Sequence, residues 1–243
     1  MVTRSNFDLY QRNLALIQEM YPQYVPLLQD TPAPGYVIEA LRPETYTCRE
    51  GVEGPWRHGP GDPWGETEQA IQEANYTQQS LFLVIRPGLG YMPLSLYPLL
   101  RKGRNAQRML IVEDRIALFR ESLHRFDWTD ILRSDRTILL LTENPIKAVV
   151  DFFVAQPVAM LPPFTGLCGV VVGEQETEIM NRLREVLNDM AHNVFRASEG
   201  FLQDLKDHYQ AAQQQPLRPK RILLVEPEHE YLADSIGKGF QDE

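Results

Sequence analysis

Cysteine is almost absent from this sequence: the 243 residues contain only Cys48 and Cys168, which lie far apart along the chain. Two isolated thiols cannot build a disulfide framework, and they do not have the ligand spacing of a zinc site. We therefore expect two reduced thiols in a cytoplasmic protein that has no metal site.

Long apolar runs and concentrations of positive charge are also missing. No stretch approaches the roughly 20 apolar residues that span a membrane, and the first residues lack the apolar core of a signal peptide. Acidic residues outnumber basic residues by 33 to 24, which gives a net charge of −9 at pH 7. Because an acidic chain repels phosphate backbones and anionic lipids, the composition disfavours nucleic acid and membranes as partners.

Residues 1–75 predict a small region of helix and hairpin. Apolar residues recur at steps of three and four over residues 5–29, as on one face of a helix. Two short stretches rich in β-branched and aromatic residues, 36–40 and 45–49, then predict a hairpin. Residues 51–65 are rich in Gly, Pro and Trp, and this composition predicts a loop.

From residue 76 to residue 173 the sequence alternates between apolar strand-like segments and helical segments. The three expected strands are residues 81–85, 108–112 and 137–141. Alternation with short connections predicts an α/β fold with a parallel sheet, right-handed crossovers and helices on both faces. This is a Rossmann-like, methyltransferase-like fold. Further strand candidates are residues 158–161 and 169–172.

Two segments follow the predicted sheet. Residues 174–215 contain a long helix whose apolar seam, 174–213, packs either on its own domain, which we favour, or on a second subunit or a partner domain. Residues 216–243 predict one further strand and helix. Such a unit cannot bury both of its faces alone. Either its strand joins the preceding sheet, or it begins a truncated second domain, and we favour the second interpretation.

The loop after the first expected strand is the clearest candidate for a ligand site. Gly88 and Gly90 allow a tight turn and a close approach of the backbone to a ligand. The next helix, expected from about Pro93 to Lys102, follows Tyr91 directly after this loop, so its free N–H groups and positive dipole end face the same crevice. Arg86 stands where dinucleotide and methyl-donor loops usually have glycine. Its guanidinium either neutralises a phosphate or fills the pocket of a site that no longer binds.

Polar residues also follow the other two expected strands. Glu113 and Asp114 end the second strand, where an acidic side chain commonly accepts hydrogen bonds from ribose hydroxyls. Thr142 and Glu143 end the third strand. The carboxyl ends of parallel strands open on one edge of the sheet. We therefore expect these residues and the glycine loop to bind a nucleotide-type small molecule, with a nucleotide-sugar or S-adenosylmethionine as candidates.

The sequence shows no hydrolytic machinery: it contains neither a Gly-x-Ser-x-Gly elbow nor a His-Glu-x-x-His motif. Among the five histidines only His58, in the Gly- and Trp-rich loop, merits a test, and we expect it to be a surface histidine. Glu113 and Asp114 are adjacent on a strand end, so their side chains point apart and do not form a general acid–base pair. The catalytic residues stay unassigned.

Three blocks of the sequence resemble the N-terminal region of the motility accessory factor (Maf) glycosyltransferases, which belong with the archaeal 6-hydroxymethylpterin diphosphokinase-like proteins. Residues 13–28 are similar to the family's opening Asn-Leu…Pro…Leu helix. Residues 59–66 look like its Ser-x-Tyr-Asp-Pro-x-x-Glu-Ala segment. Residues 84–91, followed by 111–114, resemble its Gly-x-Gly-Leu-Gly-Tyr loop and Val-Glu-Pro strand end.

The resemblance covers about residues 10–155 and implies a nucleotide- or nucleotide-sugar-binding module of a glycosyltransferase-like protein, which need not catalyse a reaction alone. Arg86 replaces the first glycine of the family's loop, and Asp114 replaces its usual proline. The family's later Gly-x-Gly-Pro-Ser-Leu loop is absent from the sequence. The alternatives are an S-adenosylmethionine-dependent methyltransferase, which Arg86 and Val84 disfavour, and an interaction module with a degenerate pocket.

Overall fold

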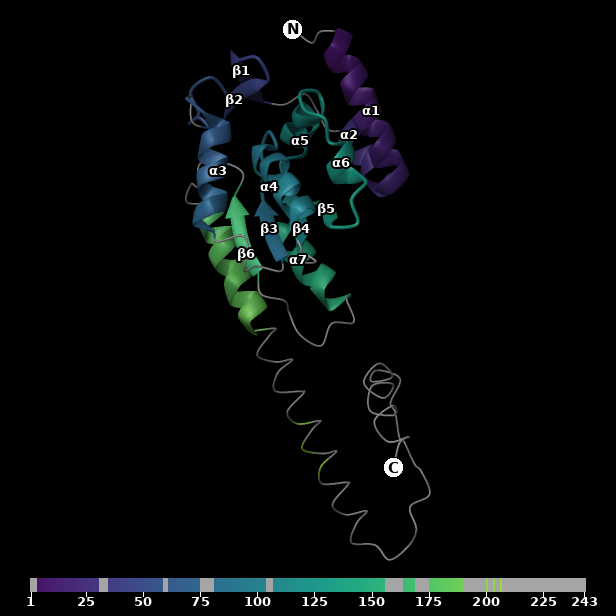
Figure 1. Ribbon diagram of the computed structural model, residues 1–243, viewed down its shortest axis with the longest axis vertical. Helices are drawn as coiled ribbons and strands as arrows, with labels where there is room; N and C mark the ends of the chain where they lie inside the picture. Colours follow the sequence, from purple (N-terminus) through teal and green to yellow (C-terminus); the bar gives the residue numbers. More distant parts are fainter. Residues whose placement is uncertain are drawn as a thin grey trace, which may run out of the picture. The chain divides into compact units, whose positions relative to one another are not determined.

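The computed structural model divides the chain into two compact units, Met1–Asn193 and Val194–Glu243 (Figure 1). The described residues are 4–30, 35–58, 61–74, 81–103, 107–155, 164–168 and 175–189, with the single positions 200, 203 and 206. In this part of the chain no helix is both long and apolar enough to cross a membrane.

Several predictions from the sequence fall outside the described residues. They are the strands at 158–161 and 169–172, the strand and helix within 216–243, and most of the seam after residue 189. The division of the chain at residues 75, 173 and 215 stays a prediction, as does a homodimer or a partner domain on the 174–213 helix.

The N-terminal helical region is divided into shorter helices than the periodicity predicted. In place of one helix over 5–29, the structure has α1 (Arg4–Met20), a 3₁₀ turn η1 (Pro22–Tyr24) and α2 (Val25–Asp30). The interruption falls at Pro22, because proline has no N–H to continue the helical hydrogen bonds and its ring clashes with the preceding turn.

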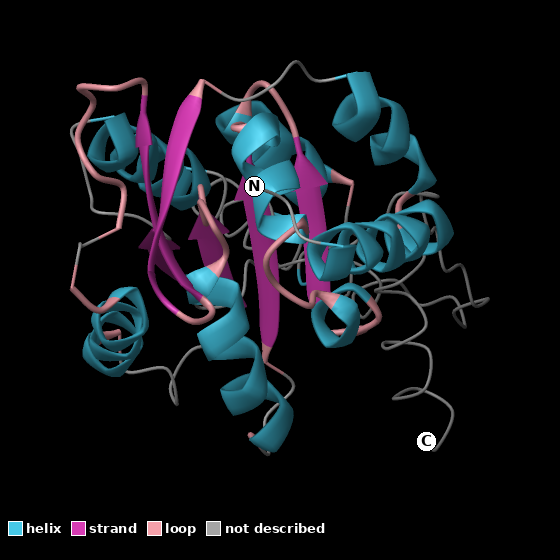
Figure 2. Ribbon diagram, turned by 90° about the horizontal axis from the view of Figure 1, so that it is seen from above, coloured by secondary structure: helices cyan, strands magenta, loops and turns pink. Residues whose placement is uncertain are grey.

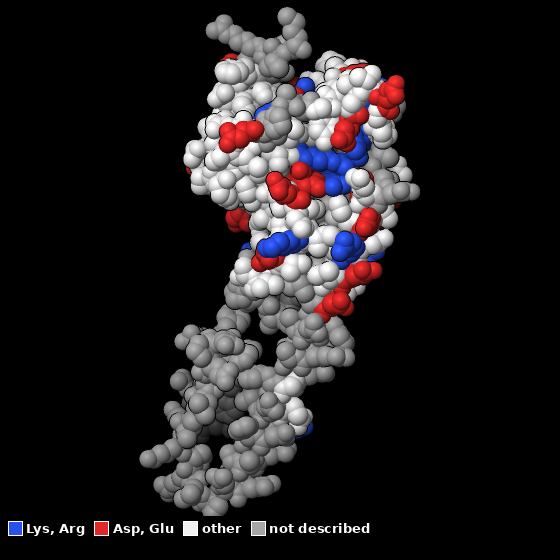
Figure 3. All heavy atoms as spheres, turned by 180° about the vertical axis from the view of Figure 1, so that it is seen from behind, with Lys and Arg blue, Asp and Glu red and all other residues white. Residues whose placement is uncertain are grey.

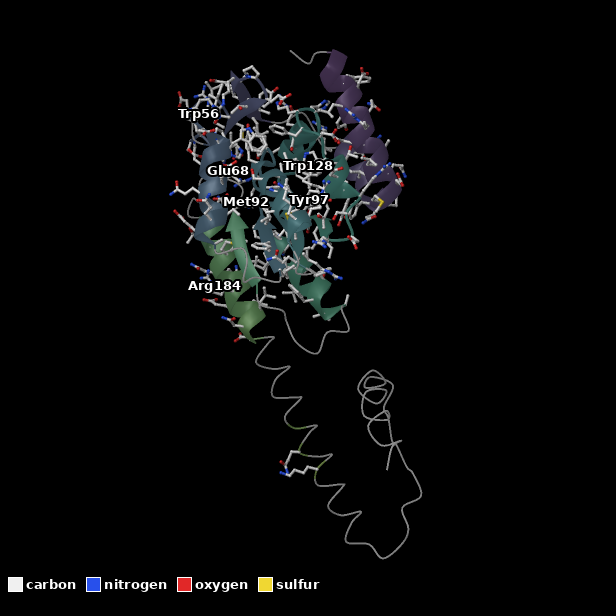
Figure 4. The ribbon with its side chains drawn as sticks, viewed as in Figure 1. Trp56, Glu68, Met92, Tyr97, Trp128 and Arg184 are labelled. Atoms are coloured by element: carbon white, nitrogen blue, oxygen red, sulfur yellow. The ribbon has the colours of Figure 1, made fainter. Side chains whose placement is uncertain are left out.

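The predicted hairpin is confirmed as β1 (Tyr36–Arg42) paired antiparallel with β2 (Thr45–Glu50). Trp56 then folds back onto β2, where it forms an isolated bridge with Arg49 and packs under the Arg49 guanidinium at 4.5 Å (Figure 4). The predicted loop over 51–65 is too long, because α3 (Pro63–Glu73) already begins inside it. Proline is tolerated at a first helical position, where its missing N–H has no intrahelical partner to lose.

The centre of the fold is a parallel sheet of four strands in the order β5-β4-β3-β6. Their bounds are β3 (Leu81–Ile85), β4 (Arg108–Glu113), β5 (Thr137–Leu141) and β6 (Phe164–Cys168). The first three match the predicted strands to within one residue. The sequence did not predict β6, which pairs with β3 along its whole length. The Rossmann-like fold is thereby confirmed.

Helices cover both faces of this sheet (Figure 2). Those that connect its strands are α4 (Tyr91–Lys102), α5 (Ile116–Leu123), α6 (Thr129–Leu132) and α7 (Pro145–Val154), and residues 175–189 are also helical. The short α6 was not predicted, since four residues are too few to show a helical period.

Alternate residues of each strand point to opposite faces, and each face has its own core. On one face Phe82 and Val84 pack with apolar residues of α1 to α5. On the other face Leu83 packs with α7 and with Leu183 and Leu187 of the helical segment 175–189. The described part of the 174–213 seam therefore packs on its own sheet, as we favoured from the sequence.

The strand order reverses direction between β3 and β6, which is where ligands bind in open α/β sheets. From β3 the chain moves outward to β4 and β5, and it then returns to the other side of β3. The loop after β3 lies at this reversal. The fold thus places the Arg86–Tyr91 loop at the position where a Rossmann-like protein holds its ligand.

Candidate functional site

The carboxyl ends of β3, β4 and β5 meet at one edge, as the sequence predicted. The backbone N–H of Gly88 donates to Oε2 of Glu113 at 3.2 Å, and the N–H of Thr142 donates to the Glu113 carbonyl at 3.0 Å. Glu143 follows Thr142 and is exposed. The structure therefore brings the glycine loop, the predicted acid and the third strand end together.

Arg86 has an unusual backbone conformation for a residue other than glycine. Its φ is +51°, in the left-handed region that glycine adopts freely and other residues enter at a cost of about 1–2 kcal/mol. A strained arginine is stable there only if its side chain gains contacts that compensate.

Those contacts are ionic. Nε and Nη2 of Arg86 donate to the two carboxylate oxygens of Asp114 at 2.8 and 2.6 Å, a bidentate pair across the ends of β3 and β4. Nη1 donates to Oε1 of Glu176 at 3.2 Å, in the helical segment 175–189. Burial would lower the pKa of Arg86, but the bonds to Asp114 and the charge of Glu176 outweigh it and raise the pKa. The Arg86 guanidinium thus links Asp114, after the end of β4, to Glu176 of the helical segment 175–189.

Two further arginines, Arg115 and Arg57, also lie against the Glu176 carboxylate. Neither of them was predicted from the sequence as a site residue. Oε1 of Glu176 lies 2.5 Å from Nη2 of Arg115 and 3.6 Å from Nη1 of Arg57. The carboxylate is only 1% exposed. Burial would raise the pKa of Glu176, but the hydrogen bond and charge of Arg115, with Arg86 beside it, lower it overall. Glu176 is therefore a buried anion held by guanidinium groups.

Glu113, the predicted ribose acceptor, is completely buried. Its Oε1 accepts the backbone N–H of Arg115 at 2.8 Å, and its Oε2 accepts that of Gly88. Burial raises the pKa of Glu113 to about 8, even though the bond from Arg115 acts in the opposite direction. Both oxygens thus accept hydrogen bonds from the chain itself, and the side chain has no exposed surface.

His58 is buried rather than exposed, so the expectation of a surface histidine was wrong. It is 4% exposed, and its Nε2 accepts the backbone N–H of Leu89 at 3.4 Å. Its ring also packs edge-on against Tyr91, with centroids 4.9 Å apart. Burial lowers the pKa of His58 to about 3, which keeps the ring neutral. The Gly- and Trp-rich loop thus folds over the glycine loop.

Gly90 and Tyr91 hold the start of α4 against its neighbours. Gly90 has a φ of +97°, and a Cβ at this position would lie 2.5 Å from Cζ2 of Trp128. Figure 4 shows Trp128 beside α4, the helix that carries the labelled Met92 and Tyr97. The Tyr91 hydroxyl donates to the Tyr46 carbonyl at 2.7 Å and accepts the Tyr46 N–H at 2.6 Å. Both predicted ligand residues therefore make contacts within the fold.

The surface shows mixed charge. On the face drawn in Figure 3, basic side chains lie directly beside acidic ones, without an extended field of one sign. Among the described residues there is no group of three His, Cys, Asp or Glu side chains arranged to hold a metal ion. What is gathered at the sheet edge is instead a set of paired arginines and carboxylates.

Comparison with solved structures finds this fold in a larger enzyme. The chain superposes on Maf glycosyltransferase from Magnetospirillum magneticum AMB-1 with a TM-score of 0.51 and 17% sequence identity. The chain shares the fold of one region of that protein. The match covers 75% of this chain but only 35% of the other. The resemblance predicted from the three sequence blocks is thus confirmed at the level of the fold.

Comparisons of sequence alone find no such relative. No protein-family model matches the chain, and no curated protein matches it. At 17% identity the structural likeness is one of fold. The function must therefore be argued from the residues at the carboxyl edge of the sheet, above all Arg86, Glu113 and Glu176.

Proposed function

We propose that this chain is a Rossmann-like accessory module of a glycosyltransferase-like protein. We further propose that its own side chains close the carboxyl edge of the sheet to a nucleotide. The observation that carries the proposal is the position of Arg86. Its side chain bridges Asp114 and Glu176 at the carboxyl edge of the sheet, where a ligand would lie. The similar fold within a Maf glycosyltransferase supports the accessory role, because that fold occupies about a third of the larger chain.

The hydrogen bonds of the loop support closure. A phosphate at a glycine loop binds to free backbone N–H groups. Here the N–H of Gly88 donates to Glu113, that of Leu89 donates to His58 and that of Gly90 donates to Pro87. A nucleotide would have to replace these internal bonds, so we expect the wild-type chain to bind nucleotides and nucleotide-sugars weakly or not at all.

The same residues disfavour the methyltransferase alternative. A methyl-donor site favours an acid near the end of the first strand, and Val84 stands there, fully buried within the core on one face of the sheet. The acid at the end of the second strand, Glu113, is bonded to the backbone of the chain. Neither residue is placed to hold the cofactor's ribose.

Calorimetry and thermal shift with uridine, cytidine and guanosine diphosphates, and with S-adenosylhomocysteine, test the proposal. We expect no binding by the wild-type chain. Arg86→Gly removes the guanidinium and suits the left-handed backbone, so it should gain nucleotide binding and a higher Tm by mass action. The control is Arg133→Ala, which removes a guanidinium from an exposed site.

Two results would change the conclusion. Micromolar binding of a nucleotide by the wild-type chain would show that the edge is open, and binding of S-adenosylhomocysteine would favour a methyltransferase. If Arg86→Gly folds and still binds no nucleotide, the edge is a degenerate pocket and the module serves interactions alone.

A further inference from the structure

Three arginines from separate parts of the chain converge on one oxygen atom. Arg57 comes from the loop after β2, Arg86 from the loop after β3 and Arg115 from the residue before α5. Their nearest guanidinium nitrogens lie 3.6, 3.2 and 2.5 Å from Oε1 of Glu176. The three side chains are 15, 12 and 9% exposed. Three buried guanidinium groups therefore surround one buried carboxylate oxygen.

The Glu176 carboxylate does not accept a hydrogen bond from every guanidinium N–H group that surrounds it. Nη1 of Arg115 and Nε of Arg57 are buried, and neither has a hydrogen-bond partner within the part of the chain that the structure describes. An unpaired buried donor costs about 1–3 kcal/mol, and more when the group is charged. Guanidinium groups suit phosphate, whose several oxygens accept from more than one fork at once. The geometry therefore provides more donors than Glu176 has acceptors.

The ion pairs of the three arginines also favour an anionic ligand such as phosphate. Arg86 has a second carboxylate in Asp114, and Arg57 has one in Glu50, which is 62% exposed. Among the described residues, Arg115 has an ion pair with Glu176 alone. Moving Glu176 away would leave the buried Arg115 guanidinium without an ion-pair partner among the described residues, so an anion that entered could pair with it.

We propose that Arg57 and Arg115, the two arginines of the cluster with a donor that is unpaired among the described residues, form a binding site for the phosphate group of a phosphorylated ligand, and that Glu176 occupies this site in the structure in place of that phosphate. The Glu176 side chain then acts as a latch: its withdrawal exposes the anion site, and a phosphate competes with it for the arginines. This inference deepens the proposed function, on which it rests for the location of the ligand, because it names the group that the closed edge would accept.

The test is the response of thermal stability to inorganic phosphate, at an ionic strength matched with sodium chloride. Glu176→Gln keeps the shape of the side chain but removes its charge, so the variant should have a lower Tm than wild type without phosphate. Phosphate should then raise its Tm by about 3–6 °C at a concentration tenfold above Kd. Wild type should respond far less, because its own carboxylate competes.

Two matched variants complete the design. Glu178→Gln makes the same change at an exposed position of the same helical segment, and it should respond to phosphate as wild type does. In the background of Glu176→Gln, a second change Arg115→Gln should abolish the response. If the Glu176→Gln chain does not fold, Glu176→Asp against Glu178→Asp gives the same comparison, because it withdraws the carboxylate by one methylene.

Either of two outcomes would overturn the inference: Glu176→Gln responds no more than Glu178→Gln, or the added Arg115→Gln leaves the response intact. Failure here is distinguishable from failure of the proposed function. The phosphate test keeps Arg86 and changes Glu176, whereas the nucleotide test keeps Glu176 and changes Arg86.

Discussion

The backbone N–H of Gly88 donates to the side chain of Glu113, so two residues that the sequence assigned to one ligand are bonded to each other. The bond crosses from the end of β3 to the end of β4, and it is buried. A carboxyl group that serves a ribose in an open site serves the loop itself here. The glycine loop therefore acts as part of the framework that joins the two strands.

Replacement of Glu113 by glutamine should flatten the pH dependence of stability on its alkaline side. Burial raises the pKa of Glu113 from 4.5 to about 8, so the folded chain holds a proton that the unfolded chain has released. The contribution of Glu113 to the free energy of unfolding therefore falls as the pH rises from about 4.5 to about 8. Glu113→Gln should remove this slope in urea unfolding measured between about pH 6.5 and pH 8, above the range in which His58 acts in the opposite direction.

Glu143→Gln is the matched control for this change, because Glu143 follows the neighbouring strand and is exposed. It should keep the wild-type slope. A Glu113→Gln chain that loses stability with rising pH as steeply as wild type would mean that Glu113 is ionised in the folded chain.

Replacement of His58 by glutamine should act on the opposite side of the pH profile. Burial lowers the pKa of His58 from 6.5 to about 3, so the unfolded chain takes up a proton that the folded chain does not. The contribution of His58 to the free energy of unfolding therefore falls as the pH falls from about 6.5 toward about 3. Glutamine still offers an oxygen to the N–H of Leu89, and it does not titrate.

Urea unfolding should therefore show a shallower acid limb for His58→Gln, with the slope above pH 6.5 unchanged as an internal control. An acid limb equal to that of wild type would contradict a neutral, buried His58. Because the two groups titrate in opposite directions, the double variant with Glu113→Gln should be flatter on both sides.

Asn13 should prove structural rather than ligand-binding, although it opens one of the blocks that resemble the Maf family. Its amide donates to the carbonyls of Leu123 and Phe126, each at 2.8 Å, and accepts the N–H of Trp128 at 3.1 Å. Asn13→Ala would leave three buried backbone groups unpaired, so we expect a loss of about 2–4 kcal/mol in the free energy of unfolding. Urea unfolding at neutral pH measures it.

Gln11→Ala is the comparison for Asn13→Ala, since it truncates an exposed side chain on the same helix. It should change stability by no more than about 0.5 kcal/mol. A loss below about 1 kcal/mol for Asn13→Ala would show that water or a neighbouring side chain replaces the amide.

The strands were predictable because their burial on both faces shows directly in the sequence. Residues 81–85 form a continuous apolar run, and every one of them is buried. β6 could not be found in this way, because Phe164–Cys168 contains Gly166 and follows two prolines, which are signals of a turn. It is a strand because the edge of β3 pairs with it.

The convergence of the strand ends was predictable from the sequence, whereas the contacts that the side chains make there were not. Sheet topology alone brings Gly88, Glu113 and Thr142 to one edge. Glu176 lies 90 residues beyond Arg86, and no local pattern connects the two. Likewise, the burial of His58 depends on how the loop after β2 folds over the glycine loop. Pairings of this kind are set by the packed fold, so they have no period or motif in the sequence.

The packing of Gly90 gives a prediction in which strain and collision can be separated. Gly90 and Gly51 both have positive φ, +97° and +66°, and alanine at either position pays a backbone cost of about 1–2 kcal/mol. Around Gly51 nothing lies within 4 Å of the added Cβ, whereas at Gly90 it would lie 2.5 Å from Trp128 and 2.9 Å from Oγ of Ser122.

These two neighbours of Gly90 cannot move easily. The Ser122 hydroxyl donates to the Leu89 carbonyl at 2.6 Å and accepts the indole N–H of Trp128 at 2.9 Å, and Trp128 is fully buried. We therefore expect Gly90→Ala to reduce the free energy of unfolding by at least about 2 kcal/mol more than Gly51→Ala, as measured by urea unfolding. Equal losses in the two variants would mean that Trp128 yields, and that the positive φ alone explains the glycine.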